Sequence, residues 1–272
     1  MEKKLKLEVM ISCMNQVDCS LVERSGITSD VIMINQCDEK GSYTEYRPHQ
    51  VIRKIDVVDR GLSKSRNLAL DHVKGDIGLL CDDDESFIPD YEGMIITAFQ
   101  ELPDADVIAF KIANQKSRLK NHIQRLNFFT CLRIASWQIA FKTQPIRAKK
   151  IYFDEFMGAG TGNGGGEENK FLHDCLKAGL KLYYVPCEIA VVAQNQSTWF
   201  YGFNREFFYQ RGAATRYMLG APLAFFYAIY YVVMKQQIYR NTISPAEAFI
   251  STMHGILKND IRQQKLRSDK GE

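Results

Sequence analysis

The sequence lacks several features that would place it in common classes of protein. Its seven cysteines include no CxxC pair, and Cys13, Cys81 and Cys131 lie within apolar runs. This pattern predicts buried free thiols in a reducing compartment rather than disulfides. The first ten residues, MEKKLKLEVM, contain no apolar h-region, so we expect no secretory signal. Internal repeats are also missing.

An excess of one charge is missing too, because 35 basic and 32 acidic residues give a net charge of +3. This balance argues against nucleic acid as the main partner. Apolar residues make up 46% of the 272 residues, so a normal hydrophobic core can form. The length predicts one large α/β domain or a domain with an appendage.

Apolar runs separated by polar stretches predict the secondary structure. We expect a helix that begins near Ser63, helices over 90–102 and 169–178, and strands over residues 7–12, 31–34, 51–58, 77–81, 106–112, 136–141 and 182–185. Pro186 is expected to end the last of these strands. Strands that alternate with short helices predict a mostly parallel sheet.

Polar side chains gather where the predicted strands end, namely Ser12, then Asn35, Gln36 and Asp38, then Asp82, Asp83 and Asp84. Ligands of open α/β sheets bind at the carboxyl ends of the strands, so we expect a ligand site here. Three adjacent carboxylates repel one another, and Mg or Mn with a phosphate partner would offset that repulsion. An acidic turn that faces water is the alternative.

The segment that follows Arg60 predicts an anion site. Gly61 suits a turn, Ser63 is expected to be the N-cap, and Arg66 lies in the early turns of the helix. A helix N-terminus beside Lys64 and Arg66 attracts anions. A solvated basic helix face is the alternative.

The most glycine-rich stretch is GAGTGNGGG, residues 158–166. It contains GxGxxG but does not follow an apolar strand early in a βαβ unit, and no GK[ST] follows it. These two observations argue against a dinucleotide fingerprint and a Walker loop. We interpret it as a bendable loop that delivers Glu167 and Glu168, either of which is a general-base candidate. A role limited to complementing the helix dipole is the alternative.

The composition changes near residue 200. Aromatic residues crowd together from residue 197, and residues 217–234 carry almost no charge. We therefore expect one domain over residues 1–200 and an aromatic, helical appendage over residues 201–272. The uncharged stretch is expected to form a membrane-surface or re-entrant helix. A full membrane span, a buried helix and a dimer interface are the alternatives.

With these motifs in order, the chain resembles the family 2 glycosyltransferases with a GT-A fold over about residues 6–200. GLSKSRNLAL, residues 61–70, is similar to the family's GLSxARNxA segment. LLCDDDESFIP, residues 79–89, is similar to its strand and DxD element, and GGGEENKFL, residues 164–172, to its GEDxxFL element. The resemblance implies a Rossmann-like, mostly parallel central sheet flanked by helices.

The resemblance also implies roles for the donor-side residues. Asp84 matches the metal-binding Asp of DxD, while Asp82 and Asp83 match positions near the metal and the nucleotide ribose. Arg66 matches an Arg that lies against the nucleotide. The implied cofactors are Mn or Mg and a nucleotide-sugar donor, which we expect to be UDP-linked.

On the acceptor side, Glu168 falls where the family usually has its Asp general base, with Glu167 just before it. Trp199 resembles an aromatic residue near the acceptor. The first two strands depart from the family pattern. This chain has Ser12-Cys13-Met14 where the family commonly has Pro-Thr-Tyr, and Asn35-Gln36 where it often has Asp-Asp. The late His that many relatives give to the metal has no counterpart between His173 and His254.

The resemblance implies a metal-dependent, inverting glycosyltransferase of cell-surface polysaccharide synthesis. The expected acceptor is a hydroxyl of a glycan or of a lipid-linked molecule. The protein is expected to be peripheral, on the inner face of the cytoplasmic membrane. A homo-oligomer is left open. A nucleotidyltransferase and a non-catalytic nucleotide-binding or scaffolding subunit are the alternative functions.

Overall fold

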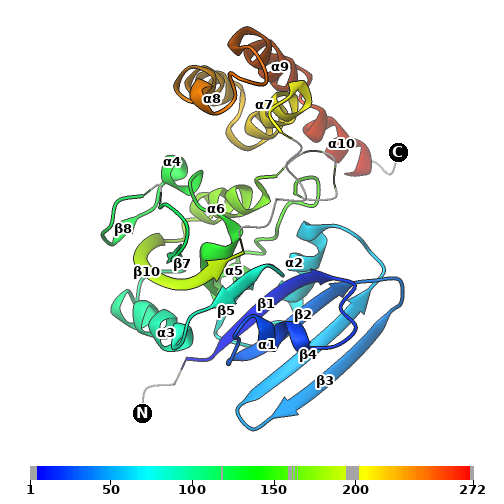
Figure 1. The fold of residues 1–272 in the computed structure, drawn as a ribbon, viewed down its shortest axis with the longest axis vertical. Helices are drawn as coiled ribbons and strands as arrows, with labels where there is room; N and C mark the ends of the chain where they lie inside the picture. Colours follow the sequence, from blue (N-terminus) through cyan, green and yellow to red (C-terminus); the bar gives the residue numbers. More distant parts are fainter. Residues whose placement is uncertain are drawn as a thin grey trace. The chain divides into compact units, whose positions relative to one another are not determined.

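The computed structural model describes residues 5–117, 119–158, 161, 163, 165–193 and 202–269 (Figure 1). The chain divides into two compact units. The sheet unit comprises Met1–Phe153 and Glu168–Asn195, and the helical unit comprises Asp154–Glu167 and Gln196–Glu272. The predicted boundary at residue 200 lies outside the described residues, and the loop before Glu168 groups with the C-terminal helices.

Within its described residues, the sheet unit holds ten strands: β1 Leu7–Met14, β2 Asp30–Gln36, β3 Gly41–Arg47, β4 Gln50–Val57, β5 Ile77–Cys81, β6 Glu85–Phe87, β7 Val107–Ile112, β8 Gln124–Arg125, β9 Ile139–Lys142 and β10 Leu182–Val192. Its helices are α1 Ser20–Arg24, α2 Leu62–His72, α3 Tyr91–Glu101, α4 Phe128–Cys131, η1 Ser136–Gln138, α5 Thr143–Ala148 and α6 Glu167–Lys177. The helical unit holds α7 Arg205–Leu219, α8 Ala221–Met234, η2 Gln236–Ile238, α9 Pro245–Lys258 and α10 Asp260–Asp269.

All of these strands form one sheet in the order β3-β4-β2-β1-β5-β9-β7-β10-β6, and β8 pairs with β10. The pairs β4-β2, β2-β1, β1-β5 and β7-β10 are parallel. β9 runs antiparallel between β5 and β7, and the edge pairs are antiparallel as well. The fold class is therefore α/β with a parallel core, as predicted.

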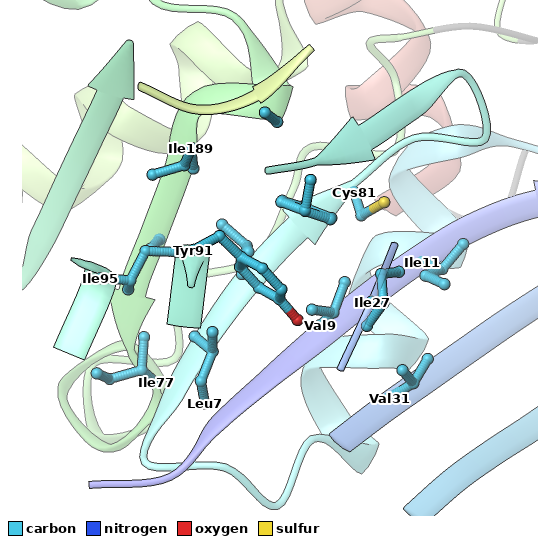
Figure 2. Packing of buried hydrophobic residues seen from close by; sticks show 14 of the residues in the cluster. Leu7, Val9, Ile11, Ile27, Val31, Ile77, Cys81, Tyr91, Ile95 and Ile189 are labelled. Carbon is cyan, nitrogen blue, oxygen red and sulfur yellow. The ribbon is translucent and has the colours of Figure 1, made fainter. Parts of the chain in front are cut away.

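The sheet is buried on both faces, and its central strands are largely apolar. Along β1, Val9 and Ile11 join one hydrophobic cluster and Met10 joins the other. The first cluster includes residues of α1 and α3, and part of it is shown in Figure 2. The second includes residues of α2, α5 and α6. Helices therefore cover both faces, and the strand ends are the expected place for a ligand.

Most predicted strands are confirmed, and the exceptions have physical reasons. β3 was missed because it is an exposed edge strand with no apolar run. Pro186 does not end β10, since the strand continues to Val192 with register shifts between Tyr184 and Ala190 that accommodate a residue without an N–H. The segment 136–141 is a 3-10 turn, η1, followed by β9 rather than one strand.

In the helical unit, α7 and α9 cross at very short range through two glycines. A Cβ on Gly212 would lie 2.1 Å from the carbonyl oxygen of Thr252, and one on Gly255 would lie 2.0 Å from that of Tyr209. The backbones of the two helices are therefore in direct contact, which any larger residue at these positions would prevent.

The uncharged stretch 217–234 is divided between two helices. Gly220 has φ +79°, which ends α7 and lets α8 begin at Ala221. Ala224 and Ala228 are buried, whereas one broad side of α8 exposes apolar residues, namely Leu223, Phe225, Phe226, Ile229, Tyr230, Val233 and Met234. Among the described helices, none combines the length and apolar character needed to cross a membrane.

Candidate active site

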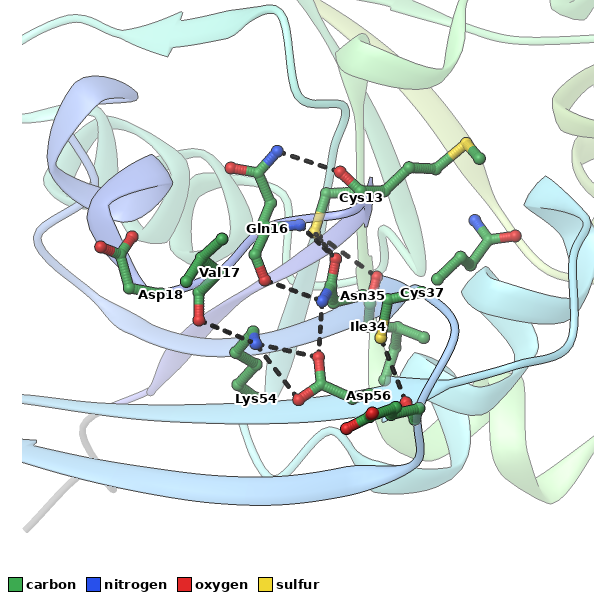
Figure 3. Close-up of polar contacts among 12 residues, drawn as sticks. Cys13, Gln16, Val17, Asp18, Ile34, Asn35, Cys37, Lys54 and Asp56 are labelled. Atoms are coloured by element: carbon green, nitrogen blue, oxygen red, sulfur yellow. Dashed lines mark hydrogen bonds and ion pairs between the residues drawn. The ribbon is translucent and has the colours of Figure 1, made fainter.

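At the carboxyl ends of β1, β2 and β4, a closed network surrounds Asn35 (Figure 3). Strand register places Cys13, Asn35 and Asp56 side by side. The Asn35 side-chain NH₂ donates to a carboxylate oxygen of Asp56 at 2.5 Å and to the backbone carbonyl of Gln16 at 2.9 Å. The Asn35 side-chain oxygen accepts from the backbone N–H of Gln16 at 2.8 Å. Asn35, which is 1% exposed, therefore holds the turn after β1.

Asp56 supplies the carboxylate that the end of β2 lacks. Lys54, itself buried, pairs with it at 2.9 Å. Burial raises the pKa of Asp56, but hydrogen bonds from Asn35 and Lys54 outweigh burial and lower it overall. Asp56 is thus a fixed negative charge at this edge of the sheet, and the polar pattern of β2 gave no indication of it.

Gln36 and Asp38 help to fix the start of α2. The Gln36 side chain accepts from the backbone N–H of Gly61 at 2.7 Å. Arg60 donates to the Gln36 carbonyl at 2.5 Å and pairs with Asp38 at 2.8 Å. Gly61, with φ +132°, is the N-cap of α2, so the expectation that Ser63 is the N-cap is wrong. Ser63 instead lies buried within the helix.

Ser12 connects β1 to the same helix. The Ser65 hydroxyl donates to the Ser12 hydroxyl at 2.9 Å, and both residues are buried. Because α2 is anchored to β1 here, the next residue of the helix, Arg66, is held close to the end of β5.

Arg66 is 2% exposed, and its guanidinium donates to one carboxylate oxygen of Asp82 at 2.8 Å. The other oxygen of Asp82 accepts from the Ser136 hydroxyl at 2.8 Å. The guanidinium carbon lies 5.5 Å from the centre of the Phe153 ring, and the Asn67 side chain holds the Phe153 backbone through two hydrogen bonds of 2.9 and 2.7 Å. A buried cation is therefore fixed at the end of β5.

Asp83 and Asp84 lie in a different electrostatic environment from Asp82. Burial, followed by repulsion from Asp82, raises the pKa of both carboxyl groups. A cation at this point would remove the repulsion, and carboxylate oxygens suit Mg or Mn. Within the described residues, no three His, Cys, Asp or Glu side chains converge as a ready-made metal site. Mg commonly takes one or two carboxylates together with substrate phosphates, so these residues fit such an ion.

Glu85 ends the acidic run inside the protein. It is 1% exposed, and neither of its carboxylate oxygens has a hydrogen-bond partner among the described residues. Burial, and then the charge of Asp82, raises its pKa well above the ordinary value. Four adjacent acids thus occupy three environments: ion-paired, repelled near the surface, and buried.

The two predicted general-base candidates differ in their surroundings. Glu167 is 4% exposed, accepts from the Gly166 N–H at 3.1 Å and lies so close to Gly158 that a Cβ there would be 3.1 Å from its carboxyl group. It therefore closes the glycine-rich loop on itself. Glu168 is only half-buried. Trp199, expected near the acceptor, lies outside the described residues.

The structure brings together Ser12, Arg66 and Asp82 through α2, and it joins Gln36 to Asp38 through Arg60. Three residues of the site were missed. Asn67 stood within GLSKSRNLAL and could have been found there, and Asp56 stood at the end of a predicted strand. Ser136 gave no sequence signal, because its hydroxyl reaches Asp82 across a separation of 54 residues.

Comparison with known proteins is consistent with this geometry. The sequence matches the family model described as Glycosyl transferase family 2 over residues 14–157. No curated protein gives a match. Two structures of TarS from S. aureus, residues 1–349, are similar in fold. The complex with UDP-GlcNAc has 14% identity and a TM-score of 0.59, over 88% of this chain and 74% of that one. The complex with UDP has 12% identity and a TM-score of 0.56, over 98% of this chain and 92% of that one.

An archaeal structure is similar as well. It is the mannosyltransferase PcManGT from Pyrobaculum calidifontis in complex with GDP-Man and Mn2+, with 12% identity and a TM-score of 0.50. The match covers 93% of this chain and 74% of that one. At such identities these structures establish a common fold.

Proposed function

This chain belongs to glycosyl transferase family 2 and is a glycosyltransferase, and we propose that it moves a sugar from a UDP-linked donor to a hydroxyl of a glycan or lipid-linked acceptor, with inversion. The observation that carries the proposal is the buried Arg66 cation at the carboxyl end of β5, paired with Asp82, whose other oxygen is held by Ser136. A fixed guanidinium at a strand end suits the diphosphate of a nucleotide-sugar.

Asp84, with Asp82 or Asp83, would hold Mg or Mn in the proposed site. When bound, such an ion would neutralise charge on the diphosphate leaving group. The raised pKa values of Asp83 and Asp84 support this assignment, because they reflect burial and repulsion from neighbouring carboxylates, both of which a bound cation would offset. Ser12, Asn35, Gln36 and Asp38 then act around the donor by fixing the ends of β1 and β2 and the start of α2.

Glu168 is the proposed general base. It takes the proton of the acceptor hydroxyl as that oxygen bonds to the anomeric carbon and the bond to the diphosphate breaks, which inverts the anomeric centre. Glu167 has the loop-closing position described above, and Trp199 remains the proposed acceptor-side aromatic.

The proposed donor is tested by thermal shift of the purified protein with UDP, GDP, CDP or TDP, each with and without Mn or Mg. A ligand at a hundred times its dissociation constant stabilises the folded state by about 2.7 kcal/mol. We expect the largest shift with UDP and metal together. A shift with another diphosphate would overturn the UDP assignment, and no shift with any of them would favour the scaffolding subunit.

Catalysis is tested with Asp84→Ala and Glu168→Gln. With a UDP-sugar as the substrate, each variant should lower turnover by about a hundredfold or more. Asp84→Ala removes a ligand of the ion that would stabilise the leaving group, and Glu168→Gln removes the general base, and each contribution usually has this size. Glu101→Gln, at an exposed position of α3, is the matched control. Near-full turnover of both variants would refute the assignment. Release of pyrophosphate instead of a nucleoside diphosphate would identify a nucleotidyltransferase.

We also propose that the exposed apolar side of α8 rests on the anionic surface of the cytoplasmic membrane. Two observations support a lipid surface. The exposed residues include Phe226 at 66%, Val233 at 55% and Met234 at 65%. From residue 207 to residue 246 the sequence contains no Asp or Glu, whereas it contains four basic residues, Arg211, Arg216, Lys235 and Arg240. Apolar exposure in a purely basic segment suits anionic lipid.

A further inference from the structure

The glycine-rich loop is attached to the last helix of the chain by a buried carboxylate. The side chain of Asp154, which is 3% exposed, accepts a hydrogen bond of 2.5 Å from the Tyr217 hydroxyl of α7. The same carboxylate oxygen pairs with the ammonium of Lys265 in α10 at 3.1 Å. Its other oxygen accepts from the Phe156 amide at 3.0 Å, which turns the backbone into the loop.

A second connection reaches the middle of the loop. The Asn163 side-chain amide donates to the side-chain oxygen of Gln264 in α10 at 2.7 Å and to the carbonyl of Phe156 at 3.0 Å. Gln264 and Lys265 are neighbours on α10, so one helix holds the loop at two points that are nine residues apart in sequence.

Apolar packing completes the attachment. Met157, at the first bend of the loop, is fully buried in a cluster with Ala213 of α7 and Ile261 of α10. At the second bend, Gly166 has φ +107°, and its Cβ position is 3.6 Å from the methyl groups of Met157 and Met218. The first bend of the loop therefore rests on α7 and α10, and the second bend rests on α7 and Met157.

The charge states make Lys265 the important contact. Burial raises the pKa of Asp154, but the Tyr217 hydrogen bond, the Phe156 amide and Lys265 together lower it, so the group is a carboxylate at neutral pH. Burial and the Asp154 charge raise the pKa of Tyr217 to about 12, so Tyr217 is the proton donor. Lys265 is the cation of this cluster, and its removal would leave a buried carboxylate without charge compensation.

We propose that Lys265 and Gln264 are positioning residues for the reaction: they fix the loop 154–166 and thereby the place of Glu167 and Glu168 at the start of α6. The inference rests on the proposed function in one respect, the role of Glu168 as base. Neither Lys265 nor Gln264 belongs to the proposed donor site, so they should affect the rate of transfer and not the binding of donor.

The variants Lys265→Met and Gln264→Ala test the proposal in the full-length protein. We expect kcat to fall about tenfold for Lys265→Met and less for Gln264→Ala, with an unchanged KM for the UDP-sugar and an unchanged thermal shift with UDP. Lys265→Arg, which keeps the positive charge, should retain most of the wild-type kcat. Arg262→Met, at an exposed position of the same helix, is the matched control.

Hydrogen exchange of peptides that cover 154–167 provides a readout independent of activity. Exchange there should rise at least severalfold in Lys265→Met and remain at the wild-type rate in Arg262→Met. Unchanged exchange in Lys265→Met would refute the attachment. Raised exchange with unchanged kcat would show that the loop is held by α10 but does not position a catalytic group.

The two levels of the proposal can fail separately. If the wild-type protein shows no transfer, the proposed function fails, while the exchange experiment still decides whether α10 holds the loop. If Lys265→Met does not fold, Tyr217→Phe replaces it, because this change removes one hydrogen bond to Asp154 and keeps the ring in the Met157 cluster. Wild-type exchange and wild-type kcat in Tyr217→Phe would then overturn the proposal.

Discussion

At the scale of single residues, Glu85 is the most costly member of the acidic run. Its carboxyl group is buried without a hydrogen-bond partner among the described residues, beside an ion-paired Asp82. An acid whose pKa is raised by folding binds its proton more tightly in the folded state than in the unfolded chain. The free energy of unfolding therefore falls as the pH rises above the ordinary value of 4.5.

This predicts a stability gain for Glu85→Gln in the metal-free protein. The wild type should lose up to about 1.4 kcal/mol more unfolding free energy per pH unit above that value than the variant, which keeps only the smaller losses from Asp83 and Asp84. Urea denaturation at pH 5 and pH 7.5 measures both slopes. We expect the variant to exceed the wild type at pH 7.5 and to match it near pH 4.5. Equal slopes for the variant, the wild type and Glu101→Gln would contradict the prediction.

Sequence patterns identify these residues unequally. Arg66 and Asp82 were found because GLSKSRNLAL and the acidic run are local motifs. The contacts of these residues are not local in sequence. The Ser136 hydroxyl donates to Asp82, and the Asn35 side-chain amide donates to Asp56 on a neighbouring strand. Asn35 was expected to belong to the ligand site, and the structure uses its side-chain amide to hold Gln16 and Asp56. A direct contact between Asn35 and the donor stays a prediction.

At the scale of elements, the crossing of α7 and α9 sets the stability of the helical unit. Gly212→Ala should gain about 1 kcal/mol of helix propensity. The new methyl group would, however, be 2.1 Å from the Thr252 carbonyl oxygen, which is backbone and cannot rotate away. We therefore expect a net loss of at least about 2 kcal/mol, because the helices must separate.

Thermal denaturation followed by far-UV circular dichroism measures this loss. Gly255→Ala should behave like Gly212→Ala, since its Cβ would be 2.0 Å from the Tyr209 carbonyl oxygen. Gly165→Ala is the control, because among the described residues no atom outside its chain neighbours lies within 4 Å of its Cβ position. If Gly212→Ala and Gly255→Ala have the same melting temperature as Gly165→Ala, the prediction that α7 and α9 are in direct backbone contact is refuted.

Periodicity predicted the elements that bury an apolar side and failed for the others. β5, β7 and α3 were located within one or two residues, because their apolar runs coincide with their bounds. β3 has no such run and depends on its pairing with β4. The stretch 217–234 reads as one helix by composition, and the positive φ of Gly220 divides it.

At the scale of the whole molecule, the proposed membrane contact predicts selective binding to anionic vesicles. The protein should float with vesicles that contain phosphatidylglycerol, less with pure phosphatidylcholine, and less again at high salt. Phe226→Ser with Val233→Ser should lower binding about tenfold or more, because each change removes exposed apolar area.

Ile250→Ser, at an exposed apolar position of α9, is the matched control for this experiment. Equal binding to neutral and anionic vesicles would contradict the electrostatic part of the proposal. A dimer in solution that the α8 variant dissociates, without any vesicle binding, would assign the apolar side of α8 to contact between two copies of the chain.

The helical unit is discontinuous in sequence, since 154–167 joins it from the middle of the chain. Recombination between related genes therefore has an unequal outcome at different crossover points. A single crossover near residue 200 combines the loop of one parent with the α7 and α10 of the other, and Asp154 would meet a foreign partner in place of Lys265. A chimera that keeps these partners together needs three junctions, at 153/154, 167/168 and 195/196. Loop and last helix are thus expected to be inherited, and to be exchanged by engineers, as one piece.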